Sequence, residues 1–327
     1  MQKVLRKRWA GLMGFAATAA VAAAASNAPV AVTAHPDPLS ALSSPDATLA
    51  ANKRLVFDMW RTIVDAGHIE AADDMLASGY IQHSPVLRTG RKAFQQIFSV
   101  VPRREVPDLV EPPLVASLAE GDLVVMSLLE RVPARAGSPA YATTHFNLFR
   151  VDQGRLAEHW HSVRTPPGPD VPLPEEGGPQ PVKGALGAAQ RVLLDSATAH
   201  LARNKRLVFD LWREIVDAGH DDRAARYVAR SFIEHGANGG STLEGFKAHF
   251  AARPDRPIQA WIASPVVAIV AERDLVALVT MHELPHPYRA DRTYTTTWFN
   301  LFRVADGRIV EHWDASTPGD PPMASAW

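Results

Sequence analysis

A carboxylate and two neutral polar side chains recur near apolar segments in the second half of this 327-residue chain. Asp314 follows Trp313 near the end of an apolar segment, where desolvation would raise the pKa of the carboxylate and make it a stronger base. His235 could donate a hydrogen bond, and Asn300 could act as a second neutral donor. A base and donors in a dry pocket can remove a proton beside a carbonyl and stabilise the enolate oxygen. These residues therefore indicate general acid–base chemistry.

The first half of the chain offers a corresponding trio. His161 stands in the place of Asp314, and His83 and Asn147 accompany it. An unperturbed imidazole titrates close to neutral pH, so His161 could serve as a base without help. Each group also has a structural interpretation. The carboxylate could bond loop amides at a strand end, and the two paired histidines could tie a strand to the following turn. The sequence leaves both interpretations open.

These two polar sets belong to a duplicated domain. Positions 52–68 and 204–220 are identical at 15 of 17 residues, and positions 146–160 and 299–313 are identical at 11 of 15. The repeat offsets, 152 and 153 residues, are too long for a solenoid unit and are close to the size of a whole domain. We therefore predict two diverged copies of one scaffold.

Each copy has the pattern of three helices followed by an antiparallel sheet. In copy one, an apolar stripe at helical spacing runs from Leu55 to Val64 and ends at Gly67. Shorter helices are expected over about 70–77 and 91–100, and tight glycine turns join the apolar strands that follow. Helices on one face of a curled sheet would enclose a cone-shaped pocket. We expect an α+β fold of two cone-shaped barrels, packed sheet to sheet as an internal pseudo-dimer in a monomeric chain.

The order of these motifs resembles the SnoaL-like branch of the nuclear transport factor 2-like superfamily. The resemblance rests on YIQHSP at 80–85, a glycine-entered helix and FNLFRVxxGRxxEHW, and it covers both copies. It implies a cone-shaped α+β domain. In the name-giving members it implies an intramolecular aldol condensation by a pocket carboxylate, without metal or organic cofactor. The resemblance is more specific for the fold than for the activity, because this scaffold also hosts isomerases, hydrolases and binding proteins.

Neither copy carries the full polar set of this family. Copy two keeps EHWD, ending at Asp314, whereas copy one reads EHWH and ends at His161. Copy one keeps YIQH, whereas copy two reads FIEH at 232–235. Asn147 and Asn300 stand where an aspartate is common in the family. We expect unequal halves, with copy two the more active.

The residues around these polar groups predict the walls of the pockets. His159 and His312 alternate with the tryptophans of EHW and are expected on the opposite sheet face, toward the domain interface. Glu158 and Glu311 are expected to pair with a neighbouring arginine. The tryptophans could belong to the core or to the pocket wall. The residues predicted to contact a ligand are Tyr80, Phe232, Asn147, Asn300, Trp160 and Trp313.

The composition argues against several other classes of protein. The chain has no cysteine, which excludes thiolate metal sites and thiol nucleophiles. Its formal net charge is −1, without a basic cluster beyond the N-terminus, so nucleic acid is an unexpected partner. No GxSxG, HExxH or phosphate-binding loop is present. His282 and His286 are only a weak zinc signal, and we predict neither metal nor cofactor.

The N-terminus has the layout of a secretory signal peptide, with a basic start, an Ala-rich apolar run and small residues before His35. We predict export to the periplasm or the medium, cleavage near Ala34 with Ala28 as an alternative, and no membrane span after cleavage. The predicted organisation is a leader over 1–34, an N-terminal segment over 35–45, domain 1 over 46–165, a Pro- and Gly-rich linker with the start of the next helix over 166–195, domain 2 over 196–317 and a tail over 318–327.

The predicted function is binding of a small apolar carbonyl compound. An enzyme of this type would catalyse cofactor-free aldol cyclisation or isomerisation with Asp314, His235, His161 and His83. The alternatives are a binding module without turnover and a structural protein whose pockets are filled by its own side chains.

Overall fold

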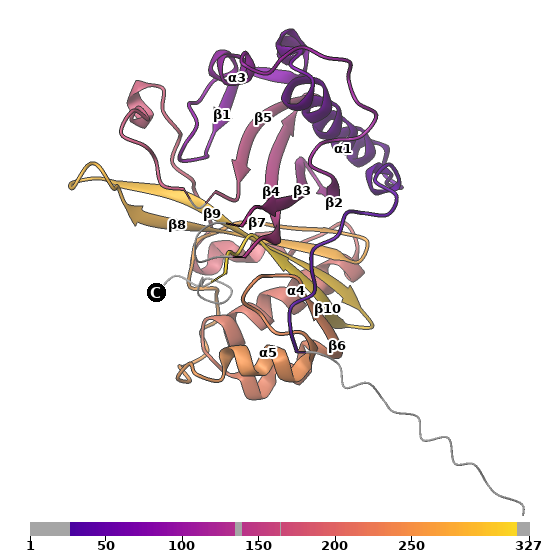
Figure 1. Cartoon of the computed structure of the whole chain (residues 1–327). Helices are drawn as coiled ribbons and strands as arrows, with labels where there is room; N and C mark the ends of the chain where they lie inside the picture. Colours follow the sequence, from indigo (N-terminus) through magenta and orange to yellow (C-terminus); the bar gives the residue numbers. More distant parts are fainter. Residues whose placement is uncertain (1–26, 135–138, 164, 319–327) are drawn as a thin grey trace, which may run out of the picture.

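The computed structural model describes residues 27–134, 139–163 and 165–318. Each copy forms a five-stranded mixed sheet with helices on one face (Figure 1). The sheet orders are β1-β5-β4-β3-β2 and β6-β10-β9-β8-β7. The predicted α+β cone is confirmed, but each sheet is open and does not close into a barrel. One pairing in each sheet, β1 with β5 and β6 with β10, is parallel rather than antiparallel.

The elements follow the same order in both copies. Copy one contains α1 (Ala47–Met59) with a π-helical turn (Trp60–Asp65), α2 (Ala72–Met75), β1 (Leu76–Gln82), α3 (Arg91–Phe98), β2 (Leu114–Glu120), β3 (Leu123–Val132), β4 (Tyr141–Asp152) and β5 (Arg155–His161). Copy two contains α4 (Ala199–Leu211) with a π-helical turn (Trp212–Val216), a 3-10 helix (Asp221–Arg226), β6 (Val228–Glu234), α5 (Thr242–Phe250), β7 (Val266–Glu272), β8 (Leu275–Pro285), β9 (Thr293–Ala305) and β10 (Arg308–Asp314).

The long helix of each copy begins and ends for identifiable reasons. The Asp46 carboxylate caps α1 by accepting hydrogen bonds from the first free backbone N–H groups. The Thr198 hydroxyl does the same for α4. Each helical stretch then stops before a glycine with positive φ, Gly67 at 72° and Gly219 at 84°. The identical repeat sequence therefore builds the same helix, with the same π-helical turn, twice.

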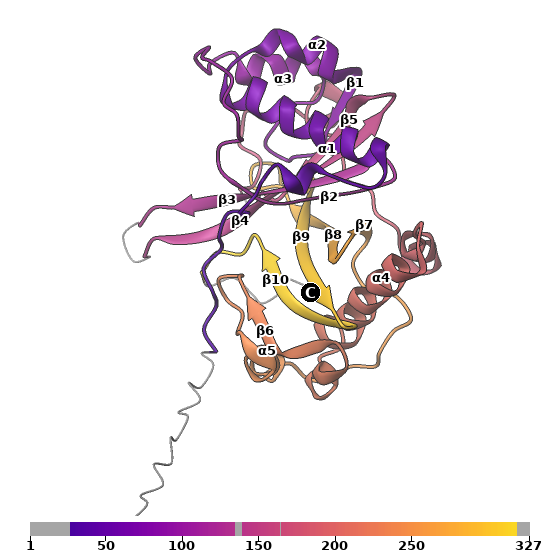
Figure 2. The ribbon, with the colours of Figure 1, turned by 90° about the vertical axis from the view of Figure 1, so that its right-hand side faces the viewer.

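The two sheets pack face to face through their helix-free faces (Figure 2). A single buried cluster contains Val125 and Phe146 from copy one and Val279 and Phe299 from copy two. The rings of Phe146 and Phe299 stack with their centroids 5.6 Å apart. This packing confirms the predicted internal pseudo-dimer.

Two reciprocal ion pairs flank this interface. Lys53 Nζ lies 2.8 Å from Glu272 Oε2, and Lys205 Nζ lies 2.6 Å from Glu120 Oε2. Each carboxylate also accepts a backbone N–H from an edge strand of the other copy. The lysines occupy equivalent positions of the repeat, as do the glutamates. The interface is therefore isologous, like that of a two-fold symmetric homodimer.

An N-terminal segment of residues 27–35 spans both copies. Val30 N donates to Glu234 O at 2.7 Å, and His35 N donates to Leu114 O at 2.7 Å. Between them, Val32 is buried in the interface cluster. Cleavage near Ala34 would remove most of this packed segment, and the predicted cleavage point stays a prediction. Most of the predicted leader lies outside the described residues, and export stays a prediction.

Candidate functional site

A buried polar chain crosses the cone of copy two. His312 on β10 donates from Nδ1 to Glu234 Oε1 at 2.8 Å, and its Nε2 lies 3.0 Å from Asn300 Oδ1. The side chains of His312 and Glu234 are 1% and 4% exposed. Burial opposes the charge on His312, yet attraction to Glu234 raises the pKa of the imidazole above its ordinary value. Burial also raises the pKa of Glu234. The sequence had not marked Glu234 or His312 as site residues.

Copy one builds the same chain without a charge. Gln82 replaces Glu234, and its Nε2 lies 3.0 Å from His159 Nδ1. His159 Nε2 lies 3.0 Å from Asn147 Oδ1. Burial among other histidines lowers the pKa of His159 well below its ordinary value, so the ring is neutral. The buried polar networks of the two copies thus differ at one position, which holds the amide of Gln82 in copy one and the carboxylate of Glu234 in copy two.

The tryptophans and histidines of the EHW motif occupy the faces opposite to those predicted. Trp160 and Trp313 belong to the interface cluster rather than to the pockets. His159 faces the cone of copy one, where it stacks on Phe149 at 4.4 Å, and His312 takes the equivalent position in copy two. The alternation along the strand was correct, but the assignment of faces was wrong because both faces of each sheet are buried.

His83 and His235 also lie on the interdomain side. Their rings stack on Trp160 and Trp313 at 4.6 and 4.8 Å. His235 Nδ1 lies 3.0 Å from Val30 O, and His83 is tied in the same way to the linker. The geometry thus fits the structural interpretation of both histidines. It does not bring His235 together with the cone-facing groups that the proposed acid–base trio required.

The strand-end pairs of Glu and Arg are confirmed. Arg150 Nε donates to Glu158 Oε1 at 2.9 Å, and Arg303 Nε donates to Glu311 Oε2 at 2.6 Å. These pairs lie on the interdomain face beside the tryptophans. Glu158 also lies 3.0 Å from a histidine ring nitrogen, which is the first cause of its lowered pKa. They stabilise the strand ends.

Asp314 shares the cone-side face of β10 with His312, but its carboxylate is hydrogen-bonded to the loop that follows the strand. Its Oδ1 accepts hydrogen bonds from Ser316 N at 3.0 Å and from Ser316 Oγ at 2.6 Å. A Cβ added at Gly236 would lie 2.6 Å from the same oxygen, so the surroundings are tight. This geometry matches the structural interpretation of a strand-end carboxylate bonded to a loop.

Tyr80 and Phe232 occupy equivalent core positions. Each ring packs edge-on against a phenylalanine of the following helix, at 5.7 Å for Tyr80 and 5.5 Å for Phe232. Both are buried within the helix-side clusters. Their predicted contact with a ligand is not tested, and their packing fits a role in the core.

The cone of copy one has a cavity of about 490 Å³ at its mouth. The projecting β3–β4 hairpin in Figure 2 supplies one wall. His145 and Glu130 both line the cavity, with His145 Nδ1 4.0 Å from Glu130 Oε2. The lining residues are Glu130, Val132, Pro133, Tyr141, Thr143, His145, Ser162, Val163, Thr165, Ala315, Thr317 and Pro318.

His161 lies directly behind His145. The ring centroids are 5.4 Å apart, and His161 Nε2 is 3.0 Å from Ser84 Oγ. Burial lowers the pKa of His161 to about 3 and also lowers the pKa of His145. Both rings are therefore neutral near pH 7. They can donate and accept hydrogen bonds, but they are weaker bases than the unperturbed imidazole expected from the sequence.

Copy two fills the equivalent place with an aromatic pair. Trp298 replaces His145, and His282 replaces Glu130 in the register of the two hairpins. The rings of Trp298 and His282 stack at 3.9 Å. Burial lowers the pKa of His282 to about 4. His145 was not among the predicted site residues, although His145 and Trp298 directly precede the second repeat block in their copies.

The end of copy two closes the cavity of copy one. The segment after β10 contributes Ala315, Thr317 and Pro318 to the lining. Thr143 Oγ1 on β4 donates to Ser316 O at 3.0 Å and holds this segment in place. The cavity is therefore built from both copies, and neither copy alone supplies all of its walls.

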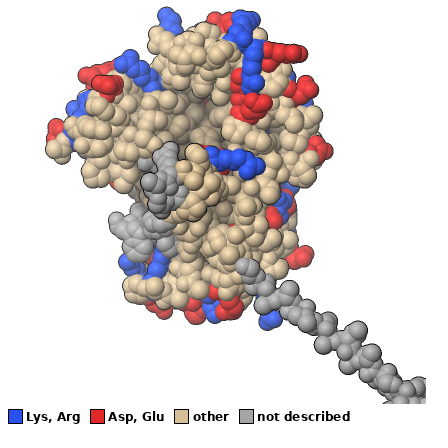
Figure 3. All heavy atoms as spheres, viewed as in Figure 1, with Lys and Arg blue, Asp and Glu red and all other residues tan. Residues whose placement is uncertain are grey.

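Within the described residues, no group of three or more His, Asp and Glu side chains has an arrangement that could hold a metal ion. No helix among those residues is both long and apolar enough to cross a membrane. On the face shown in Figure 3, acidic and basic side chains are interspersed.

Solved structures with the same fold each match about one copy. A candidate SnoaL-like polyketide cyclase from a Jannaschia species is 20% identical over 37% of this chain and 88% of its own, with a TM-score of 0.27. An NTF2-like protein of unknown function from Mesorhizobium loti is 17% identical over 37% of this chain and 98% of its own, with a TM-score of 0.28. An LEH-like epoxide hydrolase from M. tuberculosis is 15% identical over 34% of this chain and 80% of its own, with a TM-score of 0.26.

Structures described as SnoaL-like and as NTF2-like are thus among those that match parts of this chain. No family model matches the chain, and no curated protein matches it. The matched structures include proteins described as a polyketide cyclase and as an epoxide hydrolase. At these identities the likeness concerns the fold alone and does not select a substrate or a reaction.

Proposed function

We propose that this protein binds a small, largely apolar, carbonyl-bearing molecule in the cavity at the mouth of copy one. The cavity of about 490 Å³ carries this proposal. Small-molecule sites typically have volumes of about 300–1,000 Å³ and combine apolar walls with a few polar groups. The position between two domains also supports a ligand site.

The polar groups favour a neutral ligand with a hydrogen-bond acceptor. His145 is neutral because burial lowers its pKa, and a neutral imidazole can donate one hydrogen bond to a carbonyl oxygen. The Glu130 side chain, 49% exposed at the rim, would repel carboxylate and phosphate ligands. Val132, Pro133 and Val163 offer apolar contact.

Binding without turnover has more support than aldol chemistry. The lowered pKa of His161 makes this ring a weak base, and Asp314 is bonded to Ser316 and is not part of the cavity lining. Proton abstraction beside a carbonyl works best with a base whose pKa lies near the working pH. The pKa of His161 is too low for this role, and Asp314 does not line the cavity.

The test uses prodan, a fluorescent naphthyl ketone whose emission shifts to the blue in dry surroundings. We expect saturable binding to the intact chain. His145→Trp, which installs the residue of copy two, should weaken binding at least about tenfold because it fills the cavity. Trp298→Phe is the matched control and should change affinity by less than about twofold. Equal affinity of His145→Trp and the unsubstituted protein, or no saturable binding, would overturn the proposal.

A further inference from the structure

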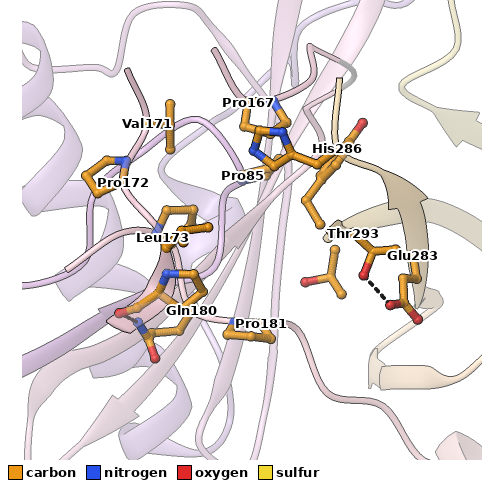
Figure 4. A pocket seen from close by; sticks show the side chains of 14 residues that line it. Pro85, Pro167, Val171, Pro172, Leu173, Gln180, Pro181, Glu283, His286 and Thr293 are labelled. Carbon is orange, nitrogen blue, oxygen red and sulfur yellow. Dashed lines mark hydrogen bonds between the residues drawn. The ribbon is translucent and has the colours of Figure 1, made fainter. Parts of the chain in front are cut away.

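A second pocket lies between the linker and the β8–β9 hairpin (Figure 4). Val171, Pro172, Leu173 and Gln180 lie on one side, and the hairpin lies on the other. Its volume is about 210 Å³, which is less than half that of the cavity in copy one. The lining residues are Pro85, Pro167, Val171, Pro172, Leu173, Pro174, Pro179, Gln180, Pro181, Glu283, His286, Thr293, Tyr294 and Thr295.

The walls of this pocket are held rigidly. Six of the lining residues are prolines, and five of these lie in the linker, where their fixed φ limits its motion. The Gln180 side chain donates to the carbonyls of Pro174 and Gly178 at 3.0 and 3.2 Å, which folds the linker back on itself. A pocket that is already formed costs a ligand little ordering entropy.

Three contacts fasten the linker to copy two around the pocket. Val182 N donates to Thr295 Oγ1 at 2.7 Å. Arg289 donates to the carbonyl oxygen of Val171 at 3.4 Å, and Arg292 lies 3.6 Å from Glu175. These contacts hold the linker against copy two beside the pocket.

The polar groups of the pocket are gathered on the hairpin. His286 Nδ1 accepts a hydrogen bond from Tyr288 N at 3.2 Å, so the proton of the neutral ring resides on Nε2. The Tyr294 ring lies nearly perpendicular to the His286 ring, with the centroids 6.3 Å apart. Glu283 accepts a hydrogen bond from the Thr293 hydroxyl and supplies a negative charge at the rim.

We propose that this pocket is a second ligand site, which takes a single aromatic ring bearing a hydroxyl group. The flat faces of the prolines and of Tyr294 suit a planar ring, and the volume limits the ligand to about one ring. His286 Nε2 can donate to the hydroxyl oxygen, and the Glu283 carboxylate can accept the hydroxyl proton in a hydrogen bond. The same carboxylate disfavours aromatic acids. The ligand class is therefore a phenol rather than a benzoate.

The experiment compares phenol with benzoate by saturation-transfer difference NMR on the full chain. We expect phenol to bind with a Kd of about 1 mM, a reasonable value for so small a ligand, and benzoate at least about fivefold more weakly. His286→Phe keeps a ring but removes the donor, and it should weaken phenol binding at least about fivefold. Leu173→Trp should abolish binding by filling the pocket.

His145→Trp separates this site from the cavity of copy one. Phenol binding to that variant should be unchanged if the linker pocket is the site, whatever happens to prodan. The proposal is overturned if phenol and benzoate bind equally, or if both His286→Phe and Leu173→Trp retain full affinity. Melting curves establish that each variant is folded, and His286→Phe alone decides the question should Leu173→Trp not fold.

Discussion

The two cones share one scaffold but differ in charge and in access. In copy two, the buried chain contains the Glu234–His312 ion pair, and stacked aromatic rings fill the mouth. In copy one, Gln82 makes the corresponding chain neutral, and the mouth holds a cavity. The reciprocal lysine–glutamate pairs at the interface are, by contrast, the same in both copies. The interiors of the two cones therefore differ, whereas the interface between the copies keeps its symmetry.

This pattern suggests a division of work between the copies. A buried ion pair constrains its surroundings, because loss of either partner leaves an uncompensated charge. Copy two thus acts as the rigid partner, and it also supplies the segment that closes the cavity of copy one. The cavity lies in the copy with the neutral interior, and the site that we propose there would place binding in copy one, whereas the sequence predicted copy two as the more active.

Removal of the buried carboxylate should produce the largest effect. Glu234→Ala leaves His312 without its counter-charge in a dry cone, and we expect the free energy of unfolding to fall by about 3–5 kcal/mol. Gln82→Ala, the matched change in copy one, removes a neutral hydrogen bond and should cost about 1–3 kcal/mol. Urea denaturation of both variants measures the difference. Equal losses in the free energy of unfolding would show that the charge of Glu234 contributes no additional stability.

The domain organisation could be predicted from the sequence more completely than the candidate site. The repeat specified two domains, and the apolar strands with glycine turns specified sheets that needed cover on both faces. The reversed assignment of Trp160 and His159 shows the limit of such reasoning. Strand alternation separates two faces, but it does not say which of two buried faces meets the helices and which meets the other copy.

The site residues that were overlooked depend on partners distant in the sequence. Glu234 becomes a buried counter-ion only because β6 pairs with β10, which brings it to His312. His145 faces a cavity only because the segment after β10 crosses from the other copy. The exchange of Gln82 for Glu234 is visible in the YIQH and FIEH motifs, and that of His145 for Trp298 lies beside the second repeat block, but neither motif gives the geometry.

Acid should destabilise the protein through buried neutral histidines, of which His161 in copy one has a pKa of about 3 and His282 in copy two a pKa of about 4. The pKa of His161 is about 3 in the folded chain, whereas an unfolded histidine titrates at about 6.5. Between these values the unfolded chain binds a proton that the folded chain does not, so stability is full above about pH 6.5 and falls as the pH drops. The slope is about 1.4 kcal/mol per pH unit for each such histidine, or about 2 kcal/mol between pH 6.5 and 5.

Two variants separate the contribution of His161 from that of His312. His161→Gln should reduce the slope of stability against pH between about pH 6.5 and 5 by the amount that corresponds to about one bound proton. Urea denaturation at each pH measures this slope. The pKa of His312 is raised, so its contribution has the opposite sign: it is present below the unfolded pKa and is lost as the pH rises through the folded pKa. His312→Gln should not flatten the acid limb. Identical acid limbs for His161→Gln and the unsubstituted protein would contradict this account.

The smallest expected effect concerns a contact through which Asp314 in copy two reaches the cavity of copy one. Asp314 in copy two holds Ser316, and Ser316 O accepts the Thr143 hydroxyl beside the cavity of copy one. Asp314→Asn keeps the shape but replaces a charge-assisted hydrogen bond with a weaker one. We expect prodan affinity at the mouth of copy one to fall about fivefold, equivalent to about 1 kcal/mol, and Ser316→Ala to act in the same direction. If neither variant changes the affinity, Asp314 serves only its own strand end. If both variants lose prodan affinity to the same extent, the Asp314 carboxylate positions a wall of the cavity in copy one. It would then have this role in place of the catalytic one that the family resemblance implies.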